Sequence, residues 1–167
     1  FLDFDVPEGV REIQIDHAKV DPDADILDWG LEDPSGFRGW GGGNDEPIVV
    51  GEQAASRSYL TGAIAAGTWR LVIGKARIGD DGAGYHVTVT LRDAPTLAPQ
   101  PERAPFEDRG PVASDGPRWY AGDLHVHSRE SGDARPPIDE IVAYAKSRRL
   151  DFVELSDHNT TSQLDFM

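Results

Sequence analysis

Proline is concentrated in one stretch of this 167-residue chain, residues 94–118, and that stretch limits how the rest can fold. Proline fixes its backbone angle φ and has no N–H to donate, so a segment rich in it is extended and unsuited to regular strand pairing. We therefore expect a linker at 94–118 between two domains, 1–93 and 119–167. Its prolines are half of the chain's 12, namely Pro95, Pro99, Pro101, Pro105, Pro111 and Pro117.

Residues 1–93 have the pattern of short β-strands separated by turns. Segments 12–16 and 85–91 alternate apolar and polar side chains with the two-residue period of a half-buried strand. Clusters of Gly, Pro, Asp and Asn separate the strand-like runs, and no convincing helix is present. The pattern predicts a β-sandwich of jelly-roll type. Further short β-prone runs are 26–27, 47–50 and 69–73.

A strand–helix–strand pattern follows the linker. Residues 120–127 and 150–155 read as strands, and the intervening Pro136-Pro137 suits the first turn of a helix. Two strands joined by a helix normally lie parallel, as a βαβ unit. The sequence thus predicts a multi-domain α and β protein, with a β-sandwich followed by a βαβ unit. The helix carries one apolar stripe, formed by Ile138, Ile141, Val142 and Ala145.

Three polar residues alternate along the first of these two strands. Asp123, His125 and His127 stand at i, i+2 and i+4, so they share one face of a strand. Carboxylate oxygen and neutral imidazole nitrogen are both good ligands for divalent metals. We therefore predict a metal site here, the alternative being a polar edge strand with a chance pair of histidines.

A second polar cluster, Asp157-His158, ends the second strand. Adjacent strands lie about 4.8 Å apart, so the two strand ends can share one or two ions. His158 is predicted as a ligand, and Asp157 either as the bridging, catalytic carboxylate or as a residue that orients a ligand. A third ligand is expected from the loop after the first strand. Asp133 is preferred to Glu130 for that role, the alternative being a solvated loop that caps the helix.

Charge and composition exclude several classes of function. The net charge is -14, which disfavours nucleic-acid binding. No apolar run approaches the roughly 20 residues that span a bilayer, so we expect a soluble protein, cytoplasmic or exported. The absence of cysteine excludes disulfides, thiolate zinc sites and a cysteine nucleophile.

Residues 123–128 and 150–160 resemble the PHP (polymerase and histidinol phosphatase) superfamily. The similarity is greatest to its CehA/McbA branch, the carbaryl-hydrolase-type metallohydrolases. The likeness extends into the first part of the chain, where 27–34, 36–40 and 67–69 resemble the β-domain that precedes the catalytic part in that branch.

The resemblance implies a distorted (β/α)7 barrel after the sandwich, of which this chain holds the first βαβ unit. It implies two or three divalent metal ions, Mn, Fe or Zn, that activate water to hydrolyse a small-molecule phosphoester or an aryl ester or carbamate. His125 and His127 match the first metal-binding motif, His158 the second, and Asp123 the acid that orients the first pair. The family often has Asp-Gly after the first motif, whereas this chain has the order Gly132-Asp133.

The same resemblance implies further ligands beyond Met167: a bridging Glu, more His and an Asp-x-His. They would come from a C-terminal segment or a separate chain that supplies the remainder of the PHP domain, and residues 1–167 alone are expected to be inactive. The alternative function is a non-catalytic β-sandwich that binds a glycan or a partner subunit, with a degenerate PHP portion. Trp29, Trp40 and Trp69 would then form a stacking platform, although we prefer them as core and loop anchors.

Overall fold

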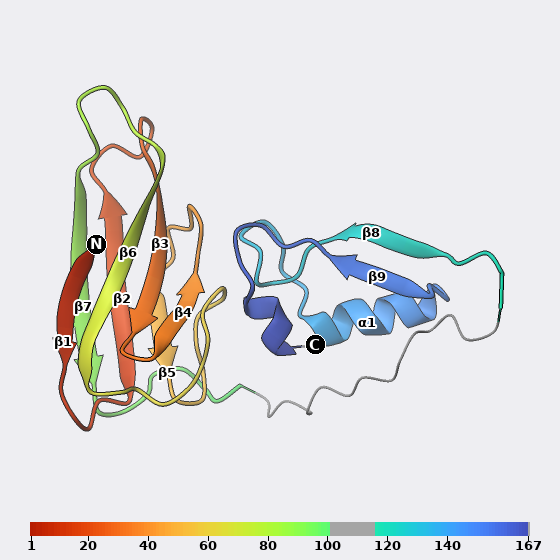
Figure 1. The fold of residues 1–167 in the computed structure, drawn as a ribbon, viewed down its shortest axis with the longest axis horizontal. Coiled ribbons are helices and arrows are strands. Elements are labelled where there is room, and N and C mark those ends of the chain that lie inside the picture. Colours follow the sequence, from red (N-terminus) through yellow and green to blue (C-terminus); the bar gives the residue numbers. More distant parts are fainter. Residues whose placement is uncertain (101–115, 167) are drawn as a thin grey trace.

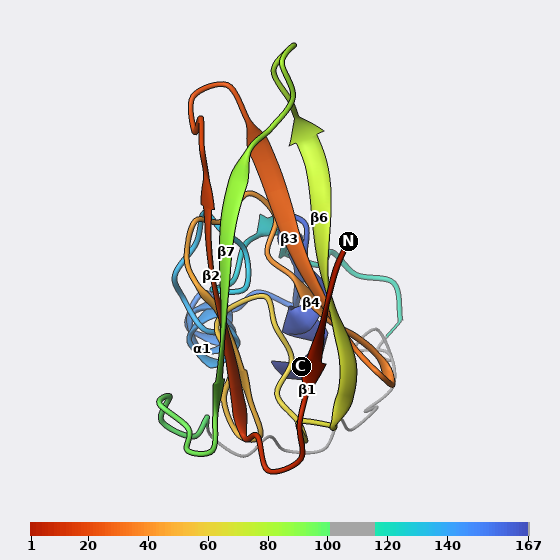
Figure 2. The same ribbon diagram turned by 90° about the vertical axis from the view of Figure 1, so that its left-hand side faces the viewer.

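The computed structural model describes residues 1–100 and 116–166, and its first part is a sandwich of two antiparallel sheets (Figures 1 and 2). One sheet has the strand order β1-β6-β3-β4, and the other has the order β5-β2-β7. These two sheets agree with the sandwich expected for residues 1–93. The strands are β1 (Leu2–Val6), β2 (Glu12–Lys19), β3 (Ile26–Asp33), β4 (Gly36–Trp40), β5 (Ile48–Gly51), β6 (Gly67–Arg77) and β7 (Tyr85–Arg92).

Alternate residues of the central strands fill the space between the two sheets. In β2, Ile13 and Ile15 are fully buried, whereas the intervening Gln14 is partly exposed. Burial of each large apolar side chain contributes about 1.5–3 kcal/mol, so this layer is the main source of the sandwich's stability. The buried cluster comprises Val6, Ile13, Ile15, Leu27, Trp29, Leu31, Ile48, Val50, Ala55, Tyr59, Trp69 and Leu71.

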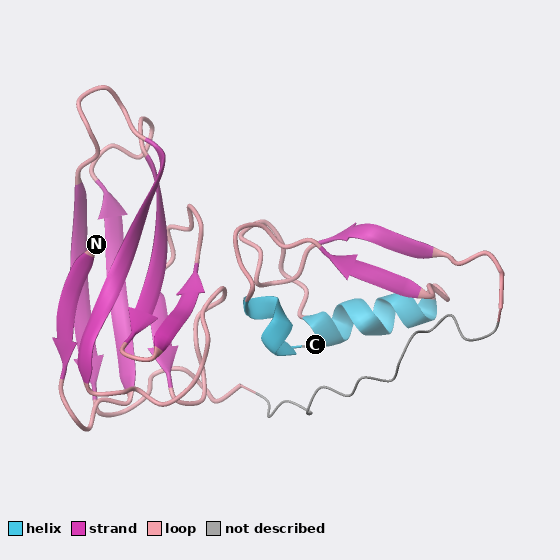
Figure 3. Ribbon diagram, viewed as in Figure 1, coloured by secondary structure: helices cyan, strands magenta, loops and turns pink. Residues whose placement is uncertain are grey.

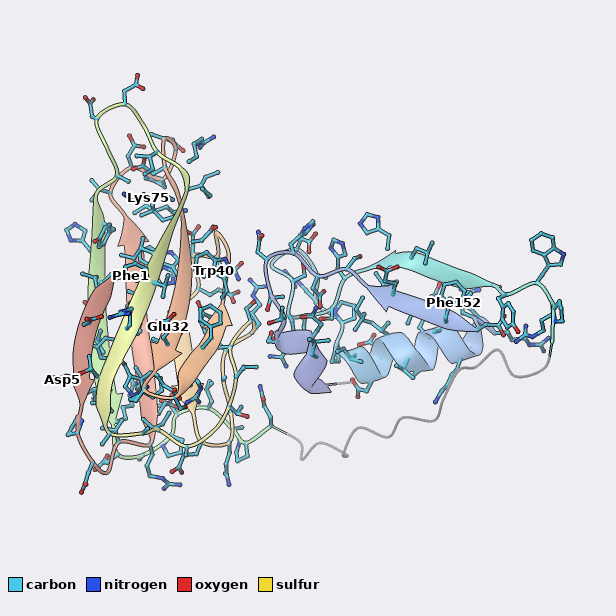
Figure 4. The ribbon with its side chains drawn as sticks, viewed as in Figure 1. Phe1, Asp5, Glu32, Trp40, Lys75 and Phe152 are labelled. Carbon is cyan, nitrogen blue, oxygen red and sulfur yellow. The ribbon has the colours of Figure 1, made fainter. Side chains whose placement is uncertain are left out.

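Two of the three sandwich tryptophans belong to this core. Trp29 and Trp69 are 1% and 0% exposed, which excludes them from a surface stacking platform. Trp40 is partly buried at the edge of the sandwich nearest the C-terminal segment (Figure 4). Its indole ring covers Gly30 and Gly74, where an added Cβ would meet it at 2.5 and 2.7 Å. The preference for these tryptophans as anchors is therefore confirmed for Trp29 and Trp69.

A small C-terminal segment follows, with two parallel strands, one α-helix and a short 3-10 helix (Figure 3). Gly122 pairs with Phe152 and Val126 with Leu155, so both strands run in the same direction. Figure 1 shows that their carboxyl ends point toward the sandwich. The elements are β8 (Gly122–Val126), α1 (Ile138–Ser147), β9 (Phe152–Leu155) and η1 (Ser162–Phe166).

Helix α1 begins directly after the Pro136-Pro137 pair. Pro137 is its N-cap and has an extended backbone, with φ -70° and ψ 161°. Acidic residues occupy the first turn and Lys146 the last, which suits the helix dipole. Ile141 and Ala145, from the predicted stripe, are its buried residues. Within the part of the chain that the structure describes, no helix is long and apolar enough to cross a membrane.

The predicted fold class, an α and β protein with the first unit of a (β/α)7 barrel, is wrong. The described residues are mainly β, with a single α-helix of 10 residues, and β8 and β9 form a separate two-stranded sheet. Nothing in 1–100 or 116–166 closes into a barrel. A barrel requires a set number of strands with a consistent tilt and stagger, and one parallel pair determines neither.

The predicted linker, 94–118, lies largely outside the described residues, since 101–115 are not described. Its first residues are held on the sandwich. The buried carboxylate of Glu12 accepts hydrogen bonds from Thr96 N at 2.8 Å, Thr96 Oγ1 at 2.6 Å and Leu97 N at 3.3 Å. The chain therefore leaves β7 along a defined path as far as Leu97.

Candidate metal centre

Three predicted ligands meet where β8 and β9 end. His127 follows β8, His158 follows β9 and Asp133 lies in the loop between β8 and α1, and each offers one ligand atom within 4.8 Å of the others. Asp133 Oδ2 lies 2.9 Å from His127 Nδ1 and 3.5 Å from His158 Nε2. The two strands are parallel and Ser156 N donates to Val126 O at 2.8 Å, so their carboxyl ends are held at one edge.

The His127 ring has one nitrogen in a hydrogen bond and one without a partner. A carboxylate only accepts hydrogen bonds, so the contact with Asp133 places a proton on Nδ1 of His127. In the neutral imidazole, Nε2 then carries the lone pair, and this atom is buried without a hydrogen-bond partner. An ion shared with Asp133 and His158 would instead replace the proton on Nδ1, because Nδ1 is the nitrogen that faces the Asp133 carboxylate at 2.9 Å. Nδ1 of His127, Oδ2 of Asp133 and Nε2 of His158 are all donor atoms that divalent metals accept, so the residues present fit a metal ion.

Asp133 carries its negative charge throughout the neutral pH range. A hydrogen bond from Ser131 and another from His127 lower the pKa of Asp133 to about 2. The Ser131 hydroxyl also accepts a hydrogen bond from His158 N at 3.1 Å, so it links two of the three ligands. An ionised carboxylate between two imidazoles gives the cluster the charge and the donor atoms that Mn, Fe or Zn bind.

Asp157 lies beside the cluster and supports it rather than joining it. Its Oδ1 accepts a hydrogen bond from Ser128 N at 2.5 Å, and its Oδ2 accepts one from Ser128 Oγ at 2.6 Å. Both oxygens are therefore engaged with the start of the loop that carries Asp133. This is the arrangement expected of a residue that orients ligands, the second of the two roles predicted for Asp157.

His125 and Asp123 stand apart from the three-residue cluster. The His125 ring centre lies 4.9 Å from that of His127, and its side chain is exposed. Asp123 Oδ1 accepts a hydrogen bond from the backbone N of His125 at 3.0 Å, so it contacts the His125 backbone and not an imidazole. Strand β8 ends at Val126 and its pairing shifts register after Asp123, so His127 lies beyond the regular alternation.

Sequence reasoning missed the residues that hold the loop in place. The sequence predicts Glu130 either as a ligand or as part of a solvated loop, but it is 2% exposed and hydrogen-bonded to Ser58 in the sandwich, 72 residues earlier. No local pattern indicates a contact over that distance. Ser131 is closer at hand in the sequence, because it stands two residues before Asp133 and its hydroxyl donates to the Asp133 carboxylate.

No family model, curated protein or solved structure matches this chain. Support for a function therefore comes from the side chains of the cluster and from the motif similarity of residues 123–128 and 150–160.

Proposed function

We propose that this chain belongs to a divalent-metal-dependent hydrolase of PHP type, with His127, Asp133 and His158 as ligands of one ion. The observation that carries the proposal is the convergence of two imidazoles, which follow parallel strand ends, with an ionised carboxylate from the loop between β8 and α1.

The exposure of the cluster favours catalysis over a purely structural metal. Structural zinc sites are closed by four protein ligands, whereas catalytic sites use three and keep a position for water or substrate. The described residues supply three ligands, and two of them, Asp133 and His158, are exposed. A bound divalent ion would act as a Lewis acid that activates water for attack on phosphorus or on a carbonyl carbon.

The chain's own residues have separate tasks around that ion. His127 would donate Nδ1, His158 would donate Nε2, and Asp133 would donate a carboxylate oxygen and balance the charge of the ion. Asp157 holds Ser128, and with it the start of the ligand loop. His125 lies beside His127 on the exposed side, where it can bind a second ion or a substrate oxygen.

Hydrolysis is tested on the intact protein loaded with Mn²⁺, Fe²⁺ or Zn²⁺, using aryl phosphate monoesters and diesters, aryl esters and aryl carbamates. We expect one of these classes to be turned over, and chelation to abolish turnover. The His158→Ala variant should lower kcat/KM by more than about 100-fold, because even residues that only orient a ligand contribute about 10- to 100-fold.

The matched control is His86→Ala, which removes an exposed histidine of β7 outside the cluster and should leave kcat/KM unchanged. Absence of metal-dependent turnover for every class would contradict the proposal. So would turnover that His158→Ala leaves intact.

A further inference from the structure

We infer that Glu130 is a positioning residue that docks the ligand loop, residues 128–133, on the β-sandwich and thereby sets the metal geometry. The inference rests on the proposed metal site at His127, Asp133 and His158. The sandwich then has a role at the proposed site, because its residue Ser58 holds the ligand loop in position.

Glu130 joins three segments that are distant in sequence. Its Oε2 accepts hydrogen bonds from Ser58 N at 2.8 Å and from Ser162 Oγ at 2.6 Å. Its backbone oxygen accepts a further hydrogen bond from Ser58 Oγ at 2.7 Å. Ser58 belongs to the sandwich domain and Ser162 begins η1, so one side chain ties the loop to both.

The Glu130 carboxylate is buried, so its hydrogen bonds contribute to keeping the loop in this position. Glu130 is 2% exposed, and a buried carboxylate is costly unless hydrogen bonds or charges compensate it. Its other oxygen, Oε1, lies 3.4 Å from Arg129 Nε but makes no hydrogen bond. The Ser58 and Ser162 donors and the Arg129 guanidinium together compensate the carboxylate, and the burial of Glu130 depends on these partners.

Ser58 presents its N–H to the loop through an uncommon backbone conformation. Its φ is +70°, in the left-handed region that non-glycine residues seldom adopt. Its carbonyl oxygen accepts a hydrogen bond from Trp40 N at 3.1 Å, which holds the residue against β4. Gly39 allows this close approach, because a Cβ there would lie 2.3 Å from the Ser58 oxygen. Such conformations persist only where the surroundings enforce them.

Hydrogen bonds within the loop link the position of Glu130 to all three proposed ligands. Glu130 N donates to Ser128 Oγ at 3.1 Å, and Ser128 directly follows His127. Ser131, the residue after Glu130, donates through its hydroxyl to Asp133 Oδ1 and accepts a hydrogen bond from the backbone N of His158. A shift of Glu130 would therefore move every ligand of the cluster.

A second contact between the sandwich and the strand-end loops lies nearby. A Cβ on Gly42 would come 3.3 Å from Asn159, next to His158, and a Cβ on Gly132 would come 2.7 Å from Asn44. Both loops that carry ligands thus touch the glycine-rich turn after β4. Figure 1 shows the same arrangement, with the ends of β8 and β9 directed at the sandwich.

The test compares Glu130→Ala with Glu12→Ala in the intact protein. Glu12 is also a fully buried carboxylate with several hydrogen-bond donors, but its partners hold the start of the linker. Zn²⁺ affinity is measured by competition with a chelator, and ligand geometry by the visible absorption spectrum of the Co²⁺ form. We expect Glu130→Ala to lower Zn²⁺ affinity by about 10- to 100-fold and to change the Co²⁺ spectrum.

Glu12→Ala should lower the thermal unfolding midpoint while leaving affinity and spectrum unchanged. Glu130→Gln keeps the size of the side chain and should restore part of the affinity. If Glu130→Ala does not fold, Ser162→Ala removes a hydroxyl donor to the Glu130 carboxylate and Ser58→Ala removes the hydroxyl donor to the Glu130 backbone oxygen. Each should give a smaller loss of affinity in a folded protein.

Wild-type Zn²⁺ affinity retained in Glu130→Ala would overturn the inference and leave the proposed metal site standing. Equal losses in Glu130→Ala and Glu12→Ala would also overturn it, since they would reflect general destabilisation. A wild-type protein that binds neither Zn²⁺ nor Co²⁺ would remove both the site and the inference.

Discussion

We expect His127→Ala to lower the affinity of the intact protein for Zn²⁺ by more than about 100-fold, because it removes a proposed ligand and not merely a residue that orients one. His127 is the central member of the cluster, in contact with Asp133 at 2.9 Å and with the His158 ring at 4.5 Å between ring centres. Its Nδ1 is the nitrogen that faces the Asp133 carboxylate. The measurement is a competition titration with a chelator of known zinc affinity.

Two further variants show whether the loss is specific. His86→Ala should bind Zn²⁺ like the wild type, because His86 is exposed on β7 and outside the cluster. His125→Ala should show a loss smaller than that of His127→Ala, because His125 lies next to the cluster but is not among its three members. Equal affinities of His127→Ala and His86→Ala would contradict the assignment of His127.

Trp69→Ala lowers the free energy of unfolding of the sandwich by about 3–5 kcal/mol, the usual cost of truncating a buried aromatic residue to alanine. Trp69 is fully buried, its Nε1 donates to Ala65 O at 2.8 Å, and the Arg38 guanidinium lies 5.3 Å from its ring centre. The variant removes apolar contacts from both sheets and leaves the Ala65 oxygen without this donor. Urea denaturation followed by circular dichroism measures the change.

Trp119→Ala provides the matched control, because Trp119 is 97% exposed. Substitutions at such exposed positions usually change stability by less than about 0.5 kcal/mol. A similar loss for both variants would show that the buried layer around Trp69 is not the main source of stability.

The strands that carry a clear period could be predicted from sequence. Segments 12–16 and 85–91 alternate cleanly, and they became β2 and β7, paired over eight residues. β1 and β4 were not foreseen, because short strands at or near a sheet edge carry little periodicity. The barrel was wrong because one strand–helix–strand pattern is compatible with several sheets, and the number of strands is not a local property.

The candidate site could be predicted as far as local rules extend. Parallel strand ends place His127 and His158 together, and the loop between β8 and α1 brings in Asp133, so the sequence predicts all three. The prediction that His125 belongs with them relied on strict alternation, which stops when β8 ends at Val126. The role of Glu130 depends on Ser58, whose contact is set by the packing of the loop on the sandwich and by no pattern in the sequence.

X-ray diffraction at the zinc absorption edge, from crystals of the intact protein grown with Zn²⁺, tests the metal site most directly. We predict an anomalous difference peak bound by His127, Asp133 and His158, with zinc–nitrogen distances of about 2.0–2.1 Å and a zinc–oxygen distance of about 2.0–2.2 Å. Crystals that contain zinc without a peak at these three residues, or with zinc bound only elsewhere, would contradict the metal centre and the hydrolase proposed from it.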